Sequence, residues 1–218
     1  SSIKLNTLDF LANDAINIKA TPGCQILVAK DGKIIFEKAF GYQTYEKKEQ
    51  ITSASIYDIA SITKIAATTL PVMKLQEEGK INVEDNISKY LEELSCTNKE
   101  YLLIRDIMAH KAGLKSWIPF YEKTMIKIHN KKFPSPEFYS NKRTKSFSVK
   151  VIDSLYLINK YREVIWDDII KSDLPNGGQY RYSDLGFYML SEAISRITGT
   201  PLDIYSANSF YTPLGLKT

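Results

Sequence analysis

The chain has 218 residues, of which 44% are hydrophobic and 25% are charged, and its formal net charge is +4. This composition is that of an ordinary globular protein, and the length allows one sizeable domain or two small ones. The positive charge is too mild to indicate a nucleic-acid-binding protein, and no run of about 18 apolar residues predicts a transmembrane helix.

The sequence predicts no metal or cofactor site. Cys24 and Cys96 match no metal-binding spacing such as C-x-x-C, and the two histidines form no H-E-x-x-H motif. Two buried free thiols are the preferred interpretation over a disulfide. The first residues lack an initiator Met and an apolar signal-peptide core, so we expect a mature protein or a piece of a longer one.

The N-terminal part of the chain predicts a helix followed by a β-hairpin. Apolar residues recur near helical spacing over residues 8–20. Two β-rich segments, 25–30 and 33–40, flank Asp31-Gly32, a dipeptide typical of a type I′ turn.

A longer helix is predicted from residue 61 to about residue 78, and Gly79 is placed to end it. Pro71 lies inside this helix and has no N–H to donate, so we expect a kink or a missing backbone bond there. Short helices are expected around 84–94 and 102–110.

Residues 115–175 differ in character from their surroundings, because they are rich in lysine and aromatic residues and show no clean period before about residue 150. Nine basic residues between 115 and 150 face only two acidic ones, Glu122 and Glu137. A solvated charged loop is the preferred interpretation over an anion-binding surface. Helices are then expected over 185–197, ending at Gly199, and near 202–211.

The candidate chemistry begins with Ser61 and Lys64, which form an S-x-x-K pattern at a predicted helix start. Residues three apart are neighbours on a helix, and a neutral lysine can take the proton of a serine nucleophile. The positive end of the helix favours the developing negative charge. The pKa of the lysine must then lie below its usual value of ~10.4. An N-cap serine with a surface lysine is the alternative.

A second motif, Tyr182-Ser183-Asp184, directly precedes the helix predicted over 185–197. With ASITK, EEGKI, MAHKAGL, YSDLGF and PLGLKT, it makes the chain resemble the serine β-lactamase and penicillin-binding-protein superfamily, nearest the class C and esterase/D,D-peptidase-like branch. That family pairs a Ser-x-x-Lys helix with a Tyr-x-Asn loop, and its phenol shares proton transfer with the lysine. The resemblance covers most of the chain.

The resemblance implies an α+β, β-lactamase/transpeptidase-like fold in which helices flank an antiparallel sheet. The helical subdomain would cover about 57–200, with an insertion at about 115–175. The N-terminal helix and hairpin, 8–40, would belong to the α/β subdomain.

One match to the family motif is expected to be accidental. Tyr139-Ser140-Asn141 fits Tyr-x-Asn letter for letter, but it lies in a basic, proline-flanked stretch with no helix behind it. Tyr182 is therefore preferred, although Asp184 stands where the family has Asn. The added negative charge would raise the pKa of Lys64 and repel anionic substrates.

The family's third motif, Lys/His-Thr/Ser-Gly, is missing, and Lys217-Thr218 is interpreted as a chance match to its first two letters. We therefore expect a truncated β-lactamase-like domain whose C-terminal sheet strands are absent. In relatives, that strand supplies one oxyanion N–H, a loss that costs about 100- to 1000-fold in turnover in well-studied serine hydrolases. Residues 1–218 alone are expected to be weakly active or inactive, and to self-associate through 25–30 or 33–40 or leave the Ser61 site distorted.

The leading hypothesis is a serine hydrolase acting through an acyl-enzyme on small esters, β-lactams or D-amino-acid cell-wall peptides. Ser61 would attack, while Lys64 and Tyr182 move protons. Asp184 and Trp117 are candidate substrate-binding residues, and His110 is expected to pack rather than act as a base. The alternatives are a non-catalytic binding or regulatory module and an accessory domain of a larger cell-wall enzyme. By resemblance, the location is periplasmic or otherwise extracytoplasmic.

Overall fold

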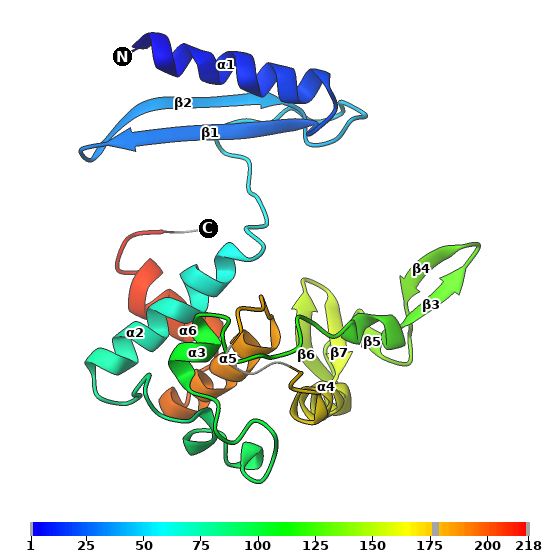
Figure 1. The fold of residues 1–218 in the computed structure, drawn as a ribbon. Coiled ribbons are helices and arrows are strands. Elements are labelled where there is room, and N and C mark those ends of the chain that lie inside the picture. Colours follow the sequence, from blue (N-terminus) through cyan, green and yellow to red (C-terminus); the bar gives the residue numbers. More distant parts are fainter. Residues whose placement is uncertain (1, 176–178, 217–218) are drawn as a thin grey trace. The chain divides into compact units, whose positions relative to one another are not determined.

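A computed structural model of the chain describes residues 2–175 and 179–216 (Figure 1). The chain divides into two compact units, Ser1–Ile59 and Ala60–Thr218, and each is described by itself. Across the described residues, every helix is too short or too polar to cross a membrane.

The first unit contains one helix and one antiparallel hairpin: α1 (Ser2–Asn17), β1 (Gly23–Lys30) and β2 (Lys33–Gly41). Asp31 and Gly32 connect the strands with φ angles of 52° and 71°, the left-handed values that a type I′ turn requires. Both predicted strands are thus confirmed. The helix begins earlier than the predicted 8–20 and packs along the sheet (Figure 1), where Asp9 and Lys38 form a 2.8 Å ion pair.

The second unit begins with a helix whose first part is a π-helix. Its elements are η1 (Lys64–Thr69), α2 (Leu70–Glu77), η2 (Ile87–Lys89), η3 (Glu92–Leu94), α3 (Ile104–Met108), η4 (Phe120–Thr124), β3 (Met125–Ile128), β4 (Lys131–Pro134), β5 (Tyr139–Ser140), β6 (Phe147–Ile152), β7 (Leu155–Ile158), α4 (Asn159–Lys171), α5 (Leu185–Thr198), α6 (Leu202–Ser206) and η5 (Ala207–Tyr211).

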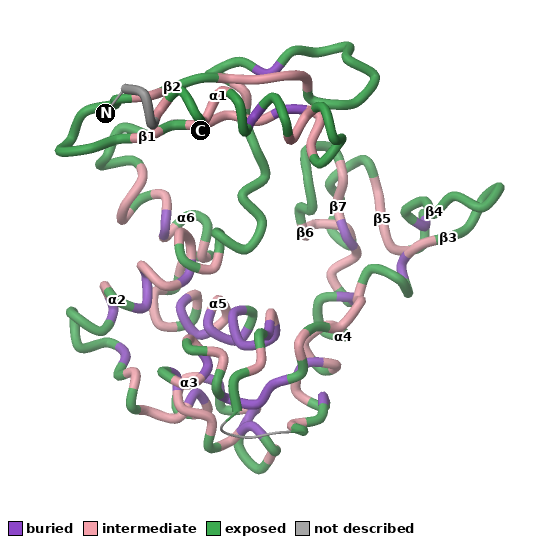
Figure 2. The backbone as a smooth tube through the Cα atoms, turned by 45° about the horizontal axis from the view of Figure 1, so that its top comes forward, coloured by how far each residue is buried: buried purple, intermediate pink, exposed green. Residues whose placement is uncertain are grey.

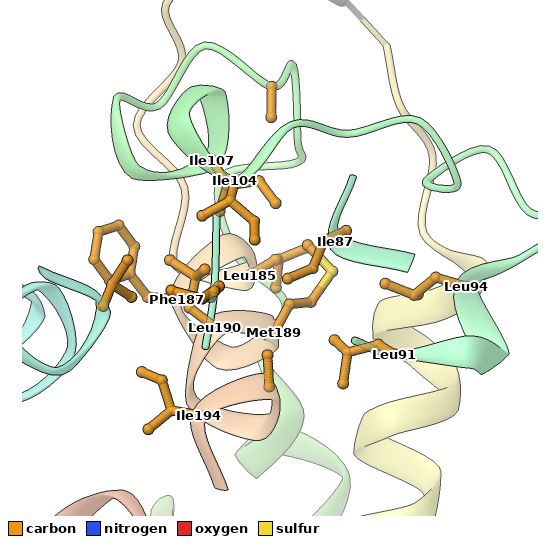
Figure 3. Close-up of a cluster of buried hydrophobic side chains, with 14 of the residues drawn as sticks. Ile87, Leu91, Leu94, Ile104, Ile107, Leu185, Phe187, Met189, Leu190 and Ile194 are labelled. Atoms are coloured by element: carbon orange, nitrogen blue, oxygen red, sulfur yellow. The ribbon is translucent and has the colours of Figure 1, made fainter. Parts of the chain in front are cut away.

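Helix α5 lies at the centre of the hydrophobic core of the second unit. One face of the helix is buried (Figure 2), and Figure 3 shows Ile104 and Ile107 of α3 and Ile87 of η2 near it; the face comprises Leu185, Met189, Leu190, Ala193 and Ile194. A Cβ on Gly186 would lie 2.6 Å from the Ile107 side chain, so glycine permits the close approach of α3. Helix α5 ends at Gly199, whose φ of 64° is left-handed, as predicted.

The predicted helix over 61–78 is confirmed in outline, with Gly79 in the left-handed conformation after it. The effect expected from Pro71 takes the form of the π-helical segment η1. The Leu70 N–H bonds to the Ile65 carbonyl, five residues earlier. In this pattern Pro71 would pair with the Ala66 carbonyl, but it has no N–H to donate.

Two hydroxyl groups from the C-terminal elements bond to the carbonyls of this segment. The Tyr211 hydroxyl donates to the Ala66 carbonyl, and the Ser206 hydroxyl donates to the Ala67 carbonyl at 2.9 Å. Side chains about 140 residues away thus compensate for the irregular backbone. The segment η1 begins at Lys64, so these bonds also hold the candidate site in place.

The basic region 115–175 is more regular than its composition indicates. It contains the β3–β4 hairpin, the three-stranded antiparallel sheet β5-β7-β6 and α4. The short helices expected around 84–94 are two 3₁₀ turns, and the one expected over 102–110 is the five-residue α3. The final expected helix, 202–211, continues from α6 into the π-helical η5.

Lys99 is fully buried, which the sequence did not indicate. Its Nζ donates to the carbonyls of Ile170 and Ser172, at 2.9 and 2.5 Å, and to Asn98 Oδ1 at 2.8 Å. Burial lowers the pKa of the lysine to about 8, against a smaller opposing effect of Asp173. The ammonium therefore satisfies carbonyls at the C-terminal end of α4.

Both cysteines are free, as preferred from the sequence. The expectation that both are buried is wrong, because Cys24 is partly exposed and Cys96 is exposed. Cys96 lies in the irregular segment after η3, where its φ of 61° places it in a turn.

Removal of the Tyr211 hydroxyl should destabilise the protein. In Tyr211→Phe the Ala66 carbonyl loses its donor, so we expect the free energy of unfolding to fall by about 1–3 kcal/mol in urea titrations. Tyr205→Phe, a change on α6, is the matched control and should cost less. In a Pro71→Ala background, which restores an N–H, the Tyr211→Phe effect should shrink. Equal losses for both tyrosines would contradict this role.

Candidate active site

Ser61 stands at the first turn of the η1–α2 helix, directly after Ala60, whose φ is 43°. The Lys64 N–H donates to the Ser61 carbonyl at 3.1 Å, so the backbone turns between the two residues. The Lys64 Nζ in turn donates to Ser61 Oγ at 3.2 Å. The short sequence spacing therefore brings the two side chains together, as predicted.

Asp184 and Tyr182 reach the same lysine from the segment before α5. The Lys64 Nζ lies 2.6 Å from Asp184 Oδ1, and the two side chains are only 15% and 34% exposed. The same Nζ lies 4.8 Å from the centre of the Tyr182 ring and 5.8 Å from that of Phe187. One ammonium group thus contacts the serine, the carboxylate and two aromatic rings.

The lysine is held in its charged form. Burial by itself would lower the pKa of Lys64, but hydrogen bonding and charge interactions with Asp184 and Tyr182 outweigh it, and the pKa is raised. The predicted effect of Asp184 is confirmed in direction. The expectation that the site lowers the lysine pKa is wrong, because the carboxylate lies too close to the ammonium.

Tyr182 is affected in the opposite direction. Hydrogen bonding to Lys64 and to Ser61, together with the positive charge of Lys64, lowers the pKa of its phenol, against a smaller raising effect of burial and of Asp184. The Tyr182 phenol therefore gives up its proton more readily than an ordinary tyrosine does. A phenolate in this place can accept the proton of the Ser61 hydroxyl.

The start of α5 is fixed by bonds to the loop after α3. The Ser183 hydroxyl donates to the Lys115 carbonyl at 2.7 Å and accepts the Leu185 N–H at 3.2 Å. The Asp184 N–H donates to the Ser116 carbonyl at 2.8 Å. These bonds set the position from which Tyr182 and Asp184 reach Lys64.

His110 supports the same loop. Its Nδ1 accepts the Ser183 N–H at 3.2 Å, and its carbonyl accepts the Arg181 N–H at 2.7 Å. Its ring lies 4.4 Å from the Tyr182 ring, centre to centre. Burial and the charge of Lys64 lower the pKa of the imidazole, against Asp184. A neutral ring that accepts a backbone N–H agrees with the packing role predicted for His110.

The structure brings four of the five predicted site residues into one cluster: Ser61, Lys64, Tyr182 and Asp184. Trp117 directly follows Ser116, whose carbonyl accepts the Asp184 N–H, so it belongs to the loop that holds the start of α5. Its side chain is 53% exposed. Tyr139 belongs to β5, and its hydroxyl bonds to Thr124 Oγ1 at 2.8 Å.

Two residues of the site were missed by the sequence reasoning. Phe187 contributes a ring near Lys64, and Ser183 fastens the loop. Phe187 could have been found, because it lies on the first turn of the helix that follows the motif. Ser183 stands inside the Tyr182-Ser183-Asp184 motif, but the motif does not indicate that its hydroxyl bonds to the Lys115 carbonyl.

Comparison with known proteins gives one family match and two curated relatives. A family model described as Beta-lactamase matches residues 11–218. A putative D-alanyl-D-alanine carboxypeptidase of Salmonella agona (strain SL483) is 32% identical over 231 residues, covering 99% of this chain and 47% of the relative. The N-acetylmuramyl-L-alanine amidase of Bacillus subtilis (strain 168) is 29% identical over 209 residues, covering 90% and 42%. The chain spans less than half the length of either relative.

A solved structure supports the fold. The octameric penicillin-binding protein homologue from Pyrococcus abyssi superposes with a TM-score of 0.68 at 21% sequence identity. The superposition covers 97% of this chain and 43% of that one. The predicted α+β, β-lactamase/transpeptidase-like fold is confirmed by this likeness.

The charge arrangement predicts opposite effects of two substitutions on the Tyr182 phenol. Lys64→Met removes the cation, so the pKa of Tyr182 should rise. Asp184→Asn removes an anion that raises this pKa, so it should fall. NMR titration of ¹³Cζ-tyrosine, with Tyr182→Phe for assignment, measures both. The control Lys74→Met, on the same helix, should leave the titration unchanged; shifts of the same sign in the two test variants would contradict the arrangement.

Proposed function

The chain belongs to the β-lactamase family, and from this premise we propose that it is a serine hydrolase that acts through an acyl-enzyme. The observation that carries the proposal is the cluster in which the Lys64 ammonium contacts the Ser61 hydroxyl and lies against Tyr182. The substrates would be small esters, β-lactams or D-amino-acid peptides of cell-wall origin. The carboxypeptidase and amidase relatives support a cell-wall substrate.

In the proposed mechanism Tyr182 is the proton acceptor, and Lys64 makes its deprotonation easier. Ser61 Oγ attacks the substrate carbonyl carbon while its proton passes to the phenolate, and the new C–O bond forms the tetrahedral intermediate. The Ser61 N–H contributes to stabilising the oxyanion. Tyr182 then returns the proton to the leaving group, which departs as the acyl-enzyme forms. Water attacks the acyl-enzyme by the reverse proton path and releases the product.

A second candidate function is a binding or regulatory module without turnover. The observation that favours it is the 2.6 Å ion pair between Lys64 and Asp184, which raises the pKa of the lysine. A lysine held as an ammonium cannot accept a proton from Ser61. Under the proposed mechanism, turnover would require deprotonation of Tyr182, and a module in which Tyr182 stays protonated would bind substrates without cleaving them.

The proposal also covers the setting in which the chain works. Cell-wall relatives support an extracytoplasmic location, including the periplasm, and the chain's coverage of less than half of each relative fits a part of a larger cell-wall enzyme. Residues 1–218 alone would be weakly active or inactive. Self-association through β1 or β2, the two strands of an isolated sheet, is part of the same proposal.

Ser61 should be the residue that an active-site reagent modifies. A fluorophosphonate probe should form one adduct, which peptide mass spectrometry should locate on Ser61. Ser61→Ala should abolish labelling, whereas Ser195→Ala, a hydroxyl on α5 that bonds to the Ser191 carbonyl, should leave it intact. An adduct on another serine, or one that persists in Ser61→Ala, would refute the role of Ser61.

Asp184→Asn should move the pH profile of ester hydrolysis to lower pH. Activity should rise with pH as Tyr182 loses its proton and fall as Lys64 loses its own. Asp184 raises the pKa of both groups, so its neutralisation lowers both and shifts both limbs the same way. Asp203→Asn, an acidic residue on α6, is the control. An unchanged profile in Asp184→Asn would show that neither limb belongs to this pair.

A further inference from the structure

One cavity of the second unit is not lined by Ser61, Lys64 or Tyr182. It has a volume of about 830 Å³ and lies between α5, α4 and the strand β6. Figure 1 shows α4 beside β6 and β7, on the side of the second unit formed by the region 115–175. The volume lies within the range of about 300–1,000 Å³ that is typical of small-molecule sites.

Tyr188 connects this cavity with the candidate active site. It lines the cavity from α5 and follows Asp184 by one helical turn, so the two side chains are neighbours on the same face. Burial raises the pKa of the Tyr188 phenol; Asp184 adds a smaller raising effect, and Lys64 opposes it. Phe120, whose ring centre lies 6.3 Å from that of Tyr188, continues the aromatic wall.

The polar side chains that line the cavity bond mainly to other groups of the protein. The Arg162 guanidinium pairs with Glu192 at 3.0 Å, and the indole N–H of Trp166 donates to Glu93 at 2.8 Å. Ser148 donates to Asn159 Oδ1 through both its N–H and its hydroxyl, at 2.9 and 2.8 Å.

Glu163 and Ser191 are the other polar lining residues, and the rest of the lining is carbon. It consists of aromatic rings and branched aliphatic side chains, namely Phe120, Val149, Ile165, Trp166, Ile169 and Tyr188. Such a surface selects a ligand by apolar contact rather than by charge.

We propose that this cavity is an acyl pocket that takes the apolar acyl group of an ester or amide substrate attacked by Ser61. This inference rests on the proposed function and adds the substrate class, acyl donors with a medium-length alkyl or aromatic side chain. An acyl group whose carbonyl carbon is bonded to Ser61 Oγ extends along the first turn of α5, past Asp184, to reach Tyr188. The pocket thus favours substrates with a longer apolar acyl group over substrates with a short one.

The test compares two esters that differ only in the acyl chain, p-nitrophenyl octanoate and p-nitrophenyl acetate. Burial of six further methylene groups should raise kcat/KM for the octanoate at least about ten-fold over the acetate. Val149→Phe, which fills the pocket from β6, should remove most of this preference while leaving acetate hydrolysis unchanged. Val151→Phe is the matched control, because Val151 lies on the same strand, is exposed and does not line the cavity.

A binding measurement that needs no turnover accompanies the kinetics. In a Ser61→Ala background, 1-octanol should cause a saturable change in tryptophan fluorescence, because Trp166 lines the cavity. Adding Val149→Phe should weaken the octanol affinity at least about ten-fold, and adding Val151→Phe should not. Saturable binding with a pocket-dependent octanoate preference supports the acyl pocket.

Two failures are distinguishable. The esters are tested on the full-length protein, because residues 1–218 alone are expected to turn over weakly or not at all. If the full-length protein hydrolyses neither ester in a Ser61-dependent way, the proposed function is wrong, and the pocket as a substrate site is wrong with it. If acetate is hydrolysed through Ser61 but octanoate is no better, or if Val149→Phe affects both esters alike, the acyl pocket is overturned while the serine hydrolase stands. Absence of saturable octanol binding also overturns it.

Discussion

The Lys64 ammonium is the charge on which the arrangement of the whole site depends. It donates to Ser61, pairs with Asp184 at 2.6 Å and lies over the Tyr182 ring, so two segments far apart in the chain meet at one group. A single cation with this many partners can exist half-buried because a carboxylate neutralises it. The same pairing raises the pKa of the lysine, and for this reason the phenol is the proton acceptor in the proposed mechanism.

Two backbone irregularities hold this cation in place. The first is the π-helical segment that begins at Lys64 and lies just before Pro71. Hydroxyls of Ser206 and Tyr211 donate to its carbonyls. The loop before α5 is fastened to the loop after α3 through Ser183. The site is therefore built where the regular hydrogen bonding of helices is interrupted, and side-chain donors from distant segments replace it.

The region 115–175 forms part of the proposed acyl pocket, which shares helix α5 with the candidate active site. Its sheet and α4 form one wall of the acyl pocket, and helix α5 forms the other. Helix α5 places Phe187 near Lys64 and Tyr188 in the wall of the pocket. Changes in this region would alter the acyl groups accepted without touching Ser61 or Lys64, because neither residue lines the cavity.

The sequence by itself determined the features that depend on contacts between residues close together in the chain. The Asp31-Gly32 turn, the end of α5 at Gly199 and the pairing of Ser61 with Lys64 depend on contacts within a few residues, and all were predicted. Asp184 could be recognised as raising the lysine pKa once a motif placed it nearby. The sequence could not show that this effect outweighs burial, that Lys99 is buried, or that a cavity opens beside Tyr188. Those outcomes depend on dielectric environment and on packing between segments distant in the chain, which only the tertiary structure decides.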